Sequence, residues 1–413
     1  MIKKYIESKK YKSKFLIGPN GSGKSFTLRK LLSDYEGKSI YISEEGNLDI
    51  KMKRRNAIPD LENKCYIFHP QKNYYGVVEE RDKIQSVKIE ERLIPLIEYC
   101  STELNYYNKI KNKSKGQEKV ANIFNILYKC FLNPIKVIFI DEPENFLDDL
   151  GLRKISKLFE LIEKSKIKLV VSSHNYNLCN LLKVTIDNII FIDKYFDEKK
   201  SIYINKMFSI KTKDILKIYE DESLKIDTYI KKNNYDSDKG IQKKLDYYKN
   251  QKLLNMYLND VLFSEQFYRS LFYKRIVLIE GATEKRIISK LKTDELHNQY
   301  YFITFGKVFV PFFYKLFSLI GKDVNAIIDS DKVMKKKSSR YGISYGLTQY
   351  LEELYGNNII VFDPDLEGFF EIDKKEFAED VPSDGEAKVY ASDEYFSKNR
   401  NKNKFIKHIN KNS

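Results

Sequence analysis

The feature that most constrains this chain is a short apolar run that leads directly into a glycine-rich loop. The run is Phe15-Leu16-Ile17, and the loop reads Gly18-Pro19-Asn20-Gly21-Ser22-Gly23-Lys24-Ser25. An amphipathic stretch follows, so the loop lies between a predicted strand and a predicted helix, as a phosphate-binding loop requires. Backbone N–H groups at Asn20, Gly21 and Gly23 can surround phosphates, and the helix N-terminus adds its positive dipole. The sequence therefore predicts an α/β domain that binds ATP or GTP.

Further residues match the chemistry of a nucleotide hydrolase. Lys24 is expected to reach the β- and γ-phosphates, and the Ser25 hydroxyl to bind Mg²⁺. The β-branched apolar run at 137–140 is typical of a buried parallel strand and ends in Asp141 and Glu142. Asp141 is expected to hold Mg²⁺ through water, and Glu142 to polarise the attacking water. A second apolar run, 168–173, ends in His174, the expected γ-phosphate sensor.

A third motif, Ser114-Lys115-Gly116-Gln117-Glu118, precedes a predicted helix that starts near Lys119. In this order, the motifs resemble those of the ABC-type ATPases. The resemblance implies that ATP is the nucleotide and that Ser114 and Gly116 of one protomer complete the ATP site of another. The chain would then form a homodimer or a higher oligomer. The resemblance also places a dimer contact near Asp148 and a metal-coupled glutamine at Gln71, with Gln85 as the alternative.

Composition sets outer limits. Lysine and arginine number 73 against 58 acidic residues, which gives a net charge of +15. That excess is consistent with nucleic-acid binding and equally with the compositional bias of an AT-rich genome. The cysteines have no paired spacing that indicates zinc or disulfides. No signal peptide and no membrane-length apolar run is evident, so we expect a cytoplasmic protein without a membrane partner.

The pattern of apolar residues suggests three regions. An ATPase region spans 1–205, a polar helical linker or dimerisation element spans 206–270, and a second α/β domain spans 271–413. Within the first region, residues 79–130 have the spacing of helices, with Ile84 and Val87 among the apolar positions. The interval between the phosphate-binding loop and Ser114 is too short for a long coiled-coil arm, which disfavours a subunit of a chromosome or repair clamp.

The third region has acidic residues at the ends of three predicted strands. The strand at 275–279 precedes Glu280, the strand at 324–328 precedes Asp329-Ser330-Asp331, and the strand at 358–362 precedes Asp363-Pro364-Asp365-Leu366-Glu367. Parallel strands would bring these carboxylates to one edge of a sheet. Their charges repel unless hard cations bind, and Mg²⁺ or Mn²⁺ prefers such oxygen ligands. The sequence therefore predicts a divalent-metal site.

This arrangement resembles the TOPRIM domain, and more narrowly the OLD-family nucleases, which join an ABC-type ATPase to a C-terminal TOPRIM domain. The resemblance is carried by the segment 272–285, by Phe305-Gly306-Lys307, by Asp329-x-Asp331 and by Asp365-Leu366-Glu367. It implies that the ions are held by Glu280, Glu284, Asp329, Asp331 and Glu367. It further implies a catalytic role for Glu280 and for a lysine near the scissile phosphate, for which Lys388 is the candidate. Two ions can activate water and stabilise the leaving oxygen of a phosphodiester.

These expectations describe an ATP-regulated, metal-dependent endonuclease that cleaves DNA. The family resemblance suggests bacterial anti-phage defence, alone or beside a partner protein or nucleic acid encoded with the chain. Two alternatives remain open at this stage. The substrate could be RNA, such as transfer RNA, or the chain could be a non-nucleolytic, ATP-driven DNA sensor that works with a partner. The residues do not distinguish nicking from double-strand cleavage, or activation by ATP hydrolysis from inhibition.

Overall fold

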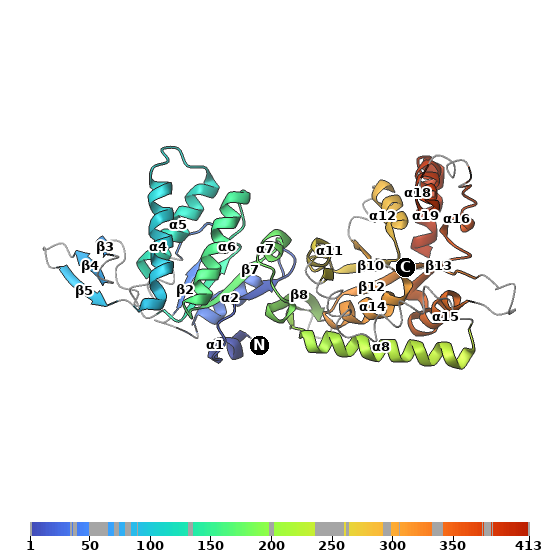
Figure 1. Ribbon diagram of the computed structural model, residues 1–413, viewed down its shortest axis with the longest axis horizontal. Helices are drawn as coiled ribbons and strands as arrows, with labels where there is room; N and C mark the ends of the chain where they lie inside the picture. Colours follow the sequence, from blue (N-terminus) through green and yellow to red (C-terminus); the bar gives the residue numbers. More distant parts are fainter. Residues whose placement is uncertain are drawn as a thin grey trace. The chain divides into compact units, whose positions relative to one another are not determined.

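The computed structural model divides the chain into two compact units, Met1–Met207 and Phe208–Ser413. The residues that it describes are 2–33, 35, 39–48, 65–69, 74–78, 84–88, 90–130, 135–197, 202–235, 260–261, 264–291, 299–304, 306–332, 342–373, 375, 381 and 383–411. Each unit is built on its own sheet with helices packed against it (Figure 1).

The sheet of the first unit has the strand order β2-β6-β7-β1-β8-β9. Its strands are β1 (Lys14–Ile17), β2 (Ser39–Ile42), β6 (Val137–Asp141), β7 (Lys168–Ser173), β8 (Ile189–Asp197) and β9 (Ile202–Phe208). The pairings from β2 through β6, β7 and β1 to β8 are parallel. The β6 side chains are buried throughout, as the apolar sequence of a central parallel strand predicts.

The helices of this unit include α4, α5 and α6, which lie side by side in Figure 1 and contact one another. The described helices are α1 (Ile2–Glu7), α2 (Lys24–Ser33), α4 (Ile94–Asn108), α5 (Lys115–Cys130), α6 (Asp149–Lys164) and α7 (Tyr176–Leu181), with short 3₁₀ turns at Glu91–Leu93 and Ile186–Asn188. Because α2 begins at Lys24, the phosphate-binding loop joins the end of β1 to the start of a helix, as predicted.

A separate three-stranded antiparallel sheet corrects one prediction. It consists of β3 (Cys65–His69), β4 (Tyr74–Val78) and β5 (Ile84–Lys88). The helical spacing read over 79–130 is therefore wrong for residues 84–88, which pair with β4 residue by residue. Hydrogen bonds to a neighbouring strand decide the conformation of so short a segment, and the spacing of Ile84 and Val87 does not contain that information.

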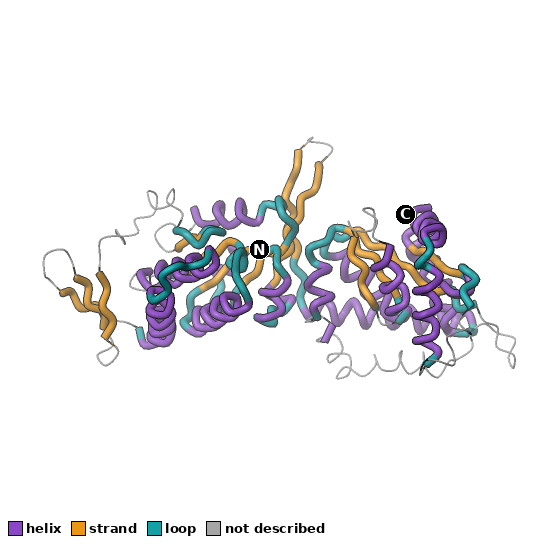
Figure 2. The backbone as a smooth tube through the Cα atoms, turned by 90° about the horizontal axis from the view of Figure 1, so that it is seen from above, coloured by secondary structure: helices purple, strands orange, loops and turns teal. Residues whose placement is uncertain are grey.

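The sheet of the second unit has four parallel strands in the order β11-β10-β12-β13. They are β10 (Arg275–Ile279), β11 (Gln299–Ile303), β12 (Asp323–Asp329) and β13 (Ile359–Phe362). They run side by side among the helices of this unit in Figure 2. The three acid-bearing strands β10, β12 and β13 are thus parallel neighbours, which confirms the predicted parallel α/β sheet.

Helices cover this sheet and complete its core. They are α8 (Thr212–Asn233), α11 (Glu265–Ser270), α12 (Ala282–Leu291), α14 (Val310–Leu319), α15 (Ile343–Tyr355), α16 (Leu366–Phe369), α18 (Asp384–Tyr395) and α19 (Asn399–Lys411), with 3₁₀ turns at Lys307–Phe309 and Gly356–Asn358. The long helix α8 packs against α14 and α15, and α12 packs against α18 (Figure 1). Helix α8, in the segment that the sequence predicts as a linker, therefore belongs to the second unit. The apolar stripe predicted at 253–262 lies almost wholly outside the described residues.

Candidate functional sites

The lysine of the phosphate-binding loop lies inside the first unit and faces the acidic end of β6. Its side chain is buried, and Nζ donates to the carbonyl oxygens of Gly18 at 2.9 Å and Pro19 at 3.1 Å. Nζ also lies 3.6 Å from Oε1 of Glu142. Burial lowers the pKa of Lys24. The structure thus brings together two residues that are far apart in the sequence, both of them predicted at the nucleotide site.

The curl of the loop depends on glycine. Gly21 and Gly23 have φ angles of +76° and +89°, which side chains rarely adopt. A Cβ atom on Gly23 would lie 2.1 Å from Nδ2 of Asn205 on β9. The sequence analysis did not find Asn205, because only the order of strands in the sheet brings β9 beside the loop. Asn20 is exposed and Ser25 half-buried on the first turn of α2.

The predicted general base and the predicted γ-phosphate sensor are in contact. Nδ1 of His174 lies 3.0 Å from Oε1 of Glu142, and the amide of Asn145 donates to Oε2 of Glu142 at 2.8 Å. Burial acts to raise the pKa of Glu142, but the contact with His174 and the charge of Lys24 outweigh it and lower that pKa. The same contact raises the pKa of His174. Glu142 is therefore held as a carboxylate, the form that a base requires.

Asp141 is fixed by a tyrosine and a serine from neighbouring strands. Tyr41 on β2 donates its hydroxyl to Oδ2 at 2.7 Å, and Ser172 on β7 donates to Oδ1. Ser172 is also the parallel partner of Asp141 in the strand register. These hydroxyls orient the carboxylate without neutralising its charge, so it keeps the capacity to interact with a cation.

Two buried charged residues at this site escaped the sequence analysis. Glu144 accepts hydrogen bonds from the Ser173 hydroxyl at 2.6 Å and from the His174 backbone N–H at 3.3 Å. Lys119 donates to the carbonyl oxygens of Glu142 at 2.7 Å and Asn145 at 3.1 Å. Both residues hold the segment around Glu142 and His174 in place. The sequence does contain a signal for Glu144, because it is a further acidic residue two positions after Glu142.

The Ser114 motif starts α5 and packs against the loop after β6. The Ser114 hydroxyl accepts from the Gln117 backbone N–H at 3.3 Å, and the Gln117 side chain accepts from the Ser114 N–H at 3.0 Å, a reciprocal cap. A Cβ on Gly116 would lie 2.2 Å from the carbonyl oxygen of Phe146, whereas Nζ of Lys115 lies over the Phe146 ring at 5.1 Å. The motif thus needs glycine at 116 and accommodates a long side chain at 115.

Three other predicted positions have different outcomes. Asp148 caps α6, and its side chain accepts from the Gly151 N–H at 2.7 Å. Gln71 lies outside the described residues, and Gln85 is described only as part of the backbone of β5. The metal-coupled glutamine therefore stays a prediction.

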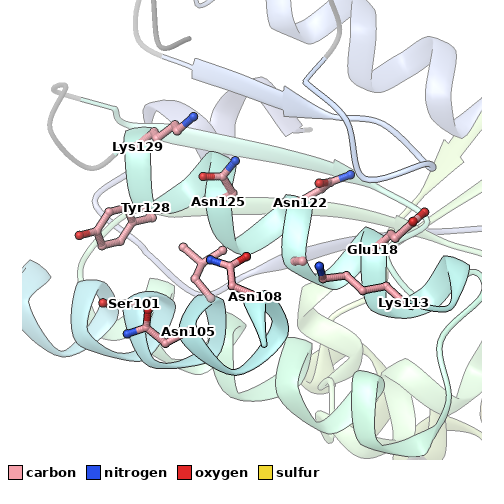
Figure 3. A pocket seen from close by; sticks show the side chains of 11 residues that line it. Ser101, Asn105, Asn108, Lys113, Glu118, Asn122, Asn125, Tyr128 and Lys129 are labelled. Carbon is pink, nitrogen blue, oxygen red and sulfur yellow. The ribbon is translucent and has the colours of Figure 1, made fainter. Parts of the chain in front are cut away.

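A polar cavity of about 700 Å³ lies between α4 and α5 (Figure 3). Its labelled residues include Asn105 and Asn108 of α4 and Asn122 and Asn125 of α5. None of the predicted nucleotide-binding residues lines it. This cavity is thus separate from the predicted site of chemistry.

In the second unit, the acidic residues follow neighbouring strands and are linked by hydrogen bonds. Oε1 of Glu280, directly after β10, accepts from the backbone N–H of Asp329 at 3.0 Å. Oδ1 of Asp329, the last residue of β12, accepts from the N–H of Leu366 at 2.9 Å. Glu284, in the first turn of α12, accepts from the N–H of Gly281 at 3.2 Å. The ends of β10 and β12 and the start of α16 are therefore joined through carboxylates.

The charges of this cluster act on one another. Burial, followed by the charges of Glu280, Glu284, Asp331 and Glu367, raises the pKa of Asp329 to about 8. Burial also raises the pKa of Glu280, and it raises that of Glu284 to about 7. Asp329 is thus the electrostatic centre of the five acids predicted as metal ligands.

A buried lysine that the sequence analysis assigned no role lies in this cluster. Nζ of Lys307 contacts Oδ2 of Asp331 at 2.7 Å and Oε1 of Glu280 at 3.7 Å. It also donates to the Asp329 carbonyl oxygen and to the Thr348 hydroxyl. Its position directly after Gly306 was quoted for the family resemblance, but only the fold shows which acids it contacts.

The predicted catalytic lysine also lies beside predicted metal ligands. Nζ of Lys388 on α18 is 3.6 Å from Oε2 of Glu367 and 3.7 Å from Oδ2 of Asp365. Burial lowers its pKa, but the charges of Glu367, Asp365 and Asp329 outweigh burial and raise it. Asp365 also caps α16 through the Gly368 N–H, which suits a supporting position. The fold therefore places Lys388 at the edge of the acidic cluster.

The donor chemistry of the cluster suits a hard divalent cation, since every acid in it offers oxygen. The excess of negative charge that raises the pKa of Asp329 is also what a cation would relieve. Over the part of the chain that the structure describes, however, no three His, Cys, Asp or Glu side chains are grouped as a formed metal site. Lys307 supplies positive charge between Glu280 and Asp331 in this arrangement.

Comparison with known proteins agrees with the division of the chain into two units. Residues 271–331 match the family model described as overcoming lysogenization defect protein-like, TOPRIM domain. The chain is 30% identical over 165 residues to an uncharacterized ABC transporter ATP-binding protein of Methanocaldococcus jannaschii, which covers 38% of this chain and 56% of the relative. It is 26% identical to the energy-coupling factor transporter ATP-binding protein EcfA of Methanococcus maripaludis, over 40% of this chain and 60% of the relative. The chain thus spans less than two thirds of these relatives.

Among solved structures, the chain is similar to the dimeric post-hydrolysis ATP-binding cassette MJ0796 bound to ADP and Pi. The identity is 19%, the TM-score 0.28, and the match covers 45% of this chain and 82% of that one. A second match is the SmcHead bound to the C-winged helix domain of ScpA, with 12% identity, a TM-score of 0.27, and coverage of 49% and 91%. Within the described residues, no helix is long and apolar enough to cross a membrane. The family model and the ATP-binding relatives together fit the OLD-family architecture, an ABC-type ATPase region followed by an OLD-like TOPRIM domain.

Proposed function

We propose that this protein is an ATP-regulated, divalent-metal-dependent endonuclease that cleaves DNA and acts in bacterial anti-phage defence. The observation that carries the proposal is the cluster around Asp329, whose pKa is raised to about 8 by burial and by the acids at the ends of β10 and β12 and on α12 and α16. A concentration of buried carboxylates is costly to folding, and active sites are where proteins retain such arrangements. The defence role rests on the family resemblance.

In this proposal, Glu280, Glu284, Asp329, Asp331 and Glu367 hold Mg²⁺ or Mn²⁺. The bound ions would supply a water nucleophile at neutral pH and charge stabilisation for the phosphodiester. Lys388, beside Glu367, is placed to offset negative charge on the phosphate as the bond breaks. The hydrogen bond from the Asp329 N–H to Glu280 and that from the Leu366 N–H to Asp329 keep two of these carboxylates oriented.

The first unit would control the cut through ATP. Lys24, Ser25 and the loop N–H groups bind the phosphates and Mg²⁺, Asp141 orients the ion, and Glu142 activates water with His174 beside it. Ser114 and Gly116 of a second protomer would complete the site, so the active species is a homodimer or a higher oligomer. A partner protein or nucleic acid encoded with the chain is a further expectation of the same resemblance.

The test is cleavage of supercoiled plasmid DNA with Mg²⁺ or Mn²⁺, with and without ATP. We expect metal-dependent cutting by the wild type and its loss in Glu280→Ala and Asp329→Ala. Asp323→Ala is the matched control, because Asp323 is exposed at the opposite end of β12. A Lys24→Ala variant then shows whether ATP activates or restrains cutting. Cutting that persists in Glu280→Ala would refute the proposed site, and cleavage of transfer RNA in place of the plasmid would refute the DNA assignment.

A further inference from the structure

A second surface of the second unit combines exposed aromatic rings with lysines. It is a cavity of about 440 Å³ between α16 and α19, which lie beside each other in Figure 1. Its lining residues are Phe369, Phe370, Glu371, Tyr395, Lys404, Lys407 and His408. We call this the aromatic–basic cavity. It contains none of the acids or lysines assigned above to nucleotide hydrolysis or DNA cleavage.

The exposed ring of Phe369 in this cavity packs against other aromatic rings. Phe369 remains 39% exposed. Its ring centroid lies 4.4 Å from that of His408, 4.9 Å from that of Phe370 and 5.3 Å from that of Phe362. Phe362 is fully buried in the core, so the supporting layer is fixed. A half-exposed ring on such a support offers a flat apolar surface with little entropy left to lose on binding.

The charge around this ring is predominantly positive. Helix α19 contains basic residues and no acid, and its apolar residues Phe405 and Ile409 are buried in the core of the second unit. Its basic side is thereby directed outward, and Lys404 and Lys407 are exposed at the cavity. Glu371 is the acid in the lining, so the two lysines leave an excess of positive charge beside the aromatic rings.

An aromatic surface flanked by lysines is the combination that binds unpaired nucleotides. Bases stack on aromatic side chains whatever their sequence, while lysines contact the phosphates. In a duplex the base faces are already stacked on their neighbours, so a ring of this kind can be used only by an unpaired strand. An apolar ligand would use the rings but would leave the lysines without a function.

The position of the cavity connects it with the proposed chemistry. Phe369 and the candidate metal ligand Glu367 belong to the same short helix, α16. Residues two positions apart on a helix do not share a face. Glu367 contacts Lys388, whereas Phe369 contacts His408 on α19. The acidic cluster and the aromatic–basic cavity therefore lie at different faces of the same short helix.

We propose that the aromatic–basic cavity binds an unpaired stretch of the DNA strand, with a base stacked on Phe369 beside His408 and with phosphates at Lys404 and Lys407. This inference rests on the proposed function and extends it, because it names single-stranded DNA next to the scissile position as the ligand. The enzyme would then favour DNA that is locally melted, frayed or flapped over uninterrupted duplex.

The experiment is a fluorescence-anisotropy titration of the full chain with labelled oligothymidylate in EDTA, so that no strand is cut. Phe369→Ala should weaken binding about 5- to 150-fold, and Phe369→Trp should retain it, because stacking is kept. Replacing both Lys404 and Lys407 by Gln should lower the slope of log affinity against log salt by about 1.4. Leu319→Ala and Lys315→Gln, at exposed positions of α14, are the matched controls and should bind as the wild type does.

Several outcomes would overturn the inference. Wild-type affinity in Phe369→Ala would exclude stacking on this ring, and an equal loss with a blunt duplex would exclude specificity for an unpaired strand. Failure of Phe369→Trp to bind would assign the effect to packing. Tighter binding of oligouridylate than of oligothymidylate would overturn the DNA assignment. Because the assay needs no cleavage, loss of the proposed nuclease activity and loss of this site are distinguishable.

Discussion

Nζ of Lys307 lies 2.7 Å from Oδ2 of Asp331 and also donates to the carbonyl oxygen of Asp329, the last residue of β12. A lysine with a buried side chain is thereby placed among carboxylates that are expected to hold divalent ions. Lys307 compensates the charge of Asp331 and lies beside Glu280. The acidic cluster and Lys307 therefore form one electrostatic unit.

Lys307→Met should destabilise the ion-free protein. The substitution keeps most of the volume of the side chain but leaves Asp331, Glu280 and the Thr348 hydroxyl without their partner. Because Asp331 is partly exposed and can gain water, we expect a loss of about 1–3 kcal/mol in the free energy of unfolding. Chemical denaturation in EDTA measures it, with Lys285→Met on the exposed side of α12 as the control. Equal stability of Lys307→Met and wild type would show that the lysine compensates no charge.

Asp329→Asn should change how stability depends on pH in EDTA. The folded-state pKa of Asp329, about 8, is above its ordinary value of 3.8. The stability contributed by the protonated carboxyl is therefore fully present below about pH 4 and is lost as pH rises toward 8. Asparagine carries no charge at any pH and can still accept from Leu366. The melting temperature of Asp329→Asn should therefore exceed that of wild type by several degrees at pH 8.5 and match it near pH 4.

Asp323→Asn is the control for this measurement, because Asp323 begins β12 in an exposed position. It should follow the wild-type curve across the whole pH range. If the melting temperature of Asp329→Asn also followed the wild-type curve, titration of Asp329 would not be what makes stability depend on pH.

Glu142→Gln should abolish most ATP hydrolysis without abolishing ATP binding. Glutamine retains the shape of the side chain and the contacts with Asn145 but cannot accept a proton from water. Loss of a general base lowers turnover about 100- to 10,000-fold. Phosphate release measures the rate, and binding of a fluorescent ATP analogue measures the retained affinity. Glu160→Gln, on the exposed side of α6, should behave as wild type, and normal turnover in Glu142→Gln would assign the base to another residue.

Substitutions at two positions of the Ser114 motif should lower stability to different extents. Gly116→Ala places a methyl group 2.2 Å from the Phe146 carbonyl oxygen, so the backbone must shift, at a cost of about 1–3 kcal/mol. Lys115→Gly removes the contact with the Phe146 ring and places a more flexible residue at the start of α5. Urea denaturation should show a clear loss for Gly116→Ala and a smaller one for Lys115→Gly. A larger loss for Lys115→Gly than for Gly116→Ala would mean that contact with the Phe146 loop is not the reason for glycine at position 116.

The sequence by itself determined the elements whose signal is local. An apolar run followed by Gly18 to Ser25 specifies strand, loop and helix because the glycines and the phosphate chemistry lie within a few residues. The buried strand before Asp141 and the acid-tipped strands before Glu280 and Asp329 were recognisable for the same reason. The segment 84–88 was not, because a hairpin partner and not its own spacing makes it a strand.

Tertiary structure alone decided which of these residues meet. The strand order brings Glu142 to Lys24 and His174, Asn205 to Gly23, and Lys307 to Asp331, and no spacing in the sequence encodes those pairs. The same holds for the ring of Phe369 beside His408. Local preferences depend on neighbouring residues, whereas burial and charge depend on which distant elements the fold places in contact.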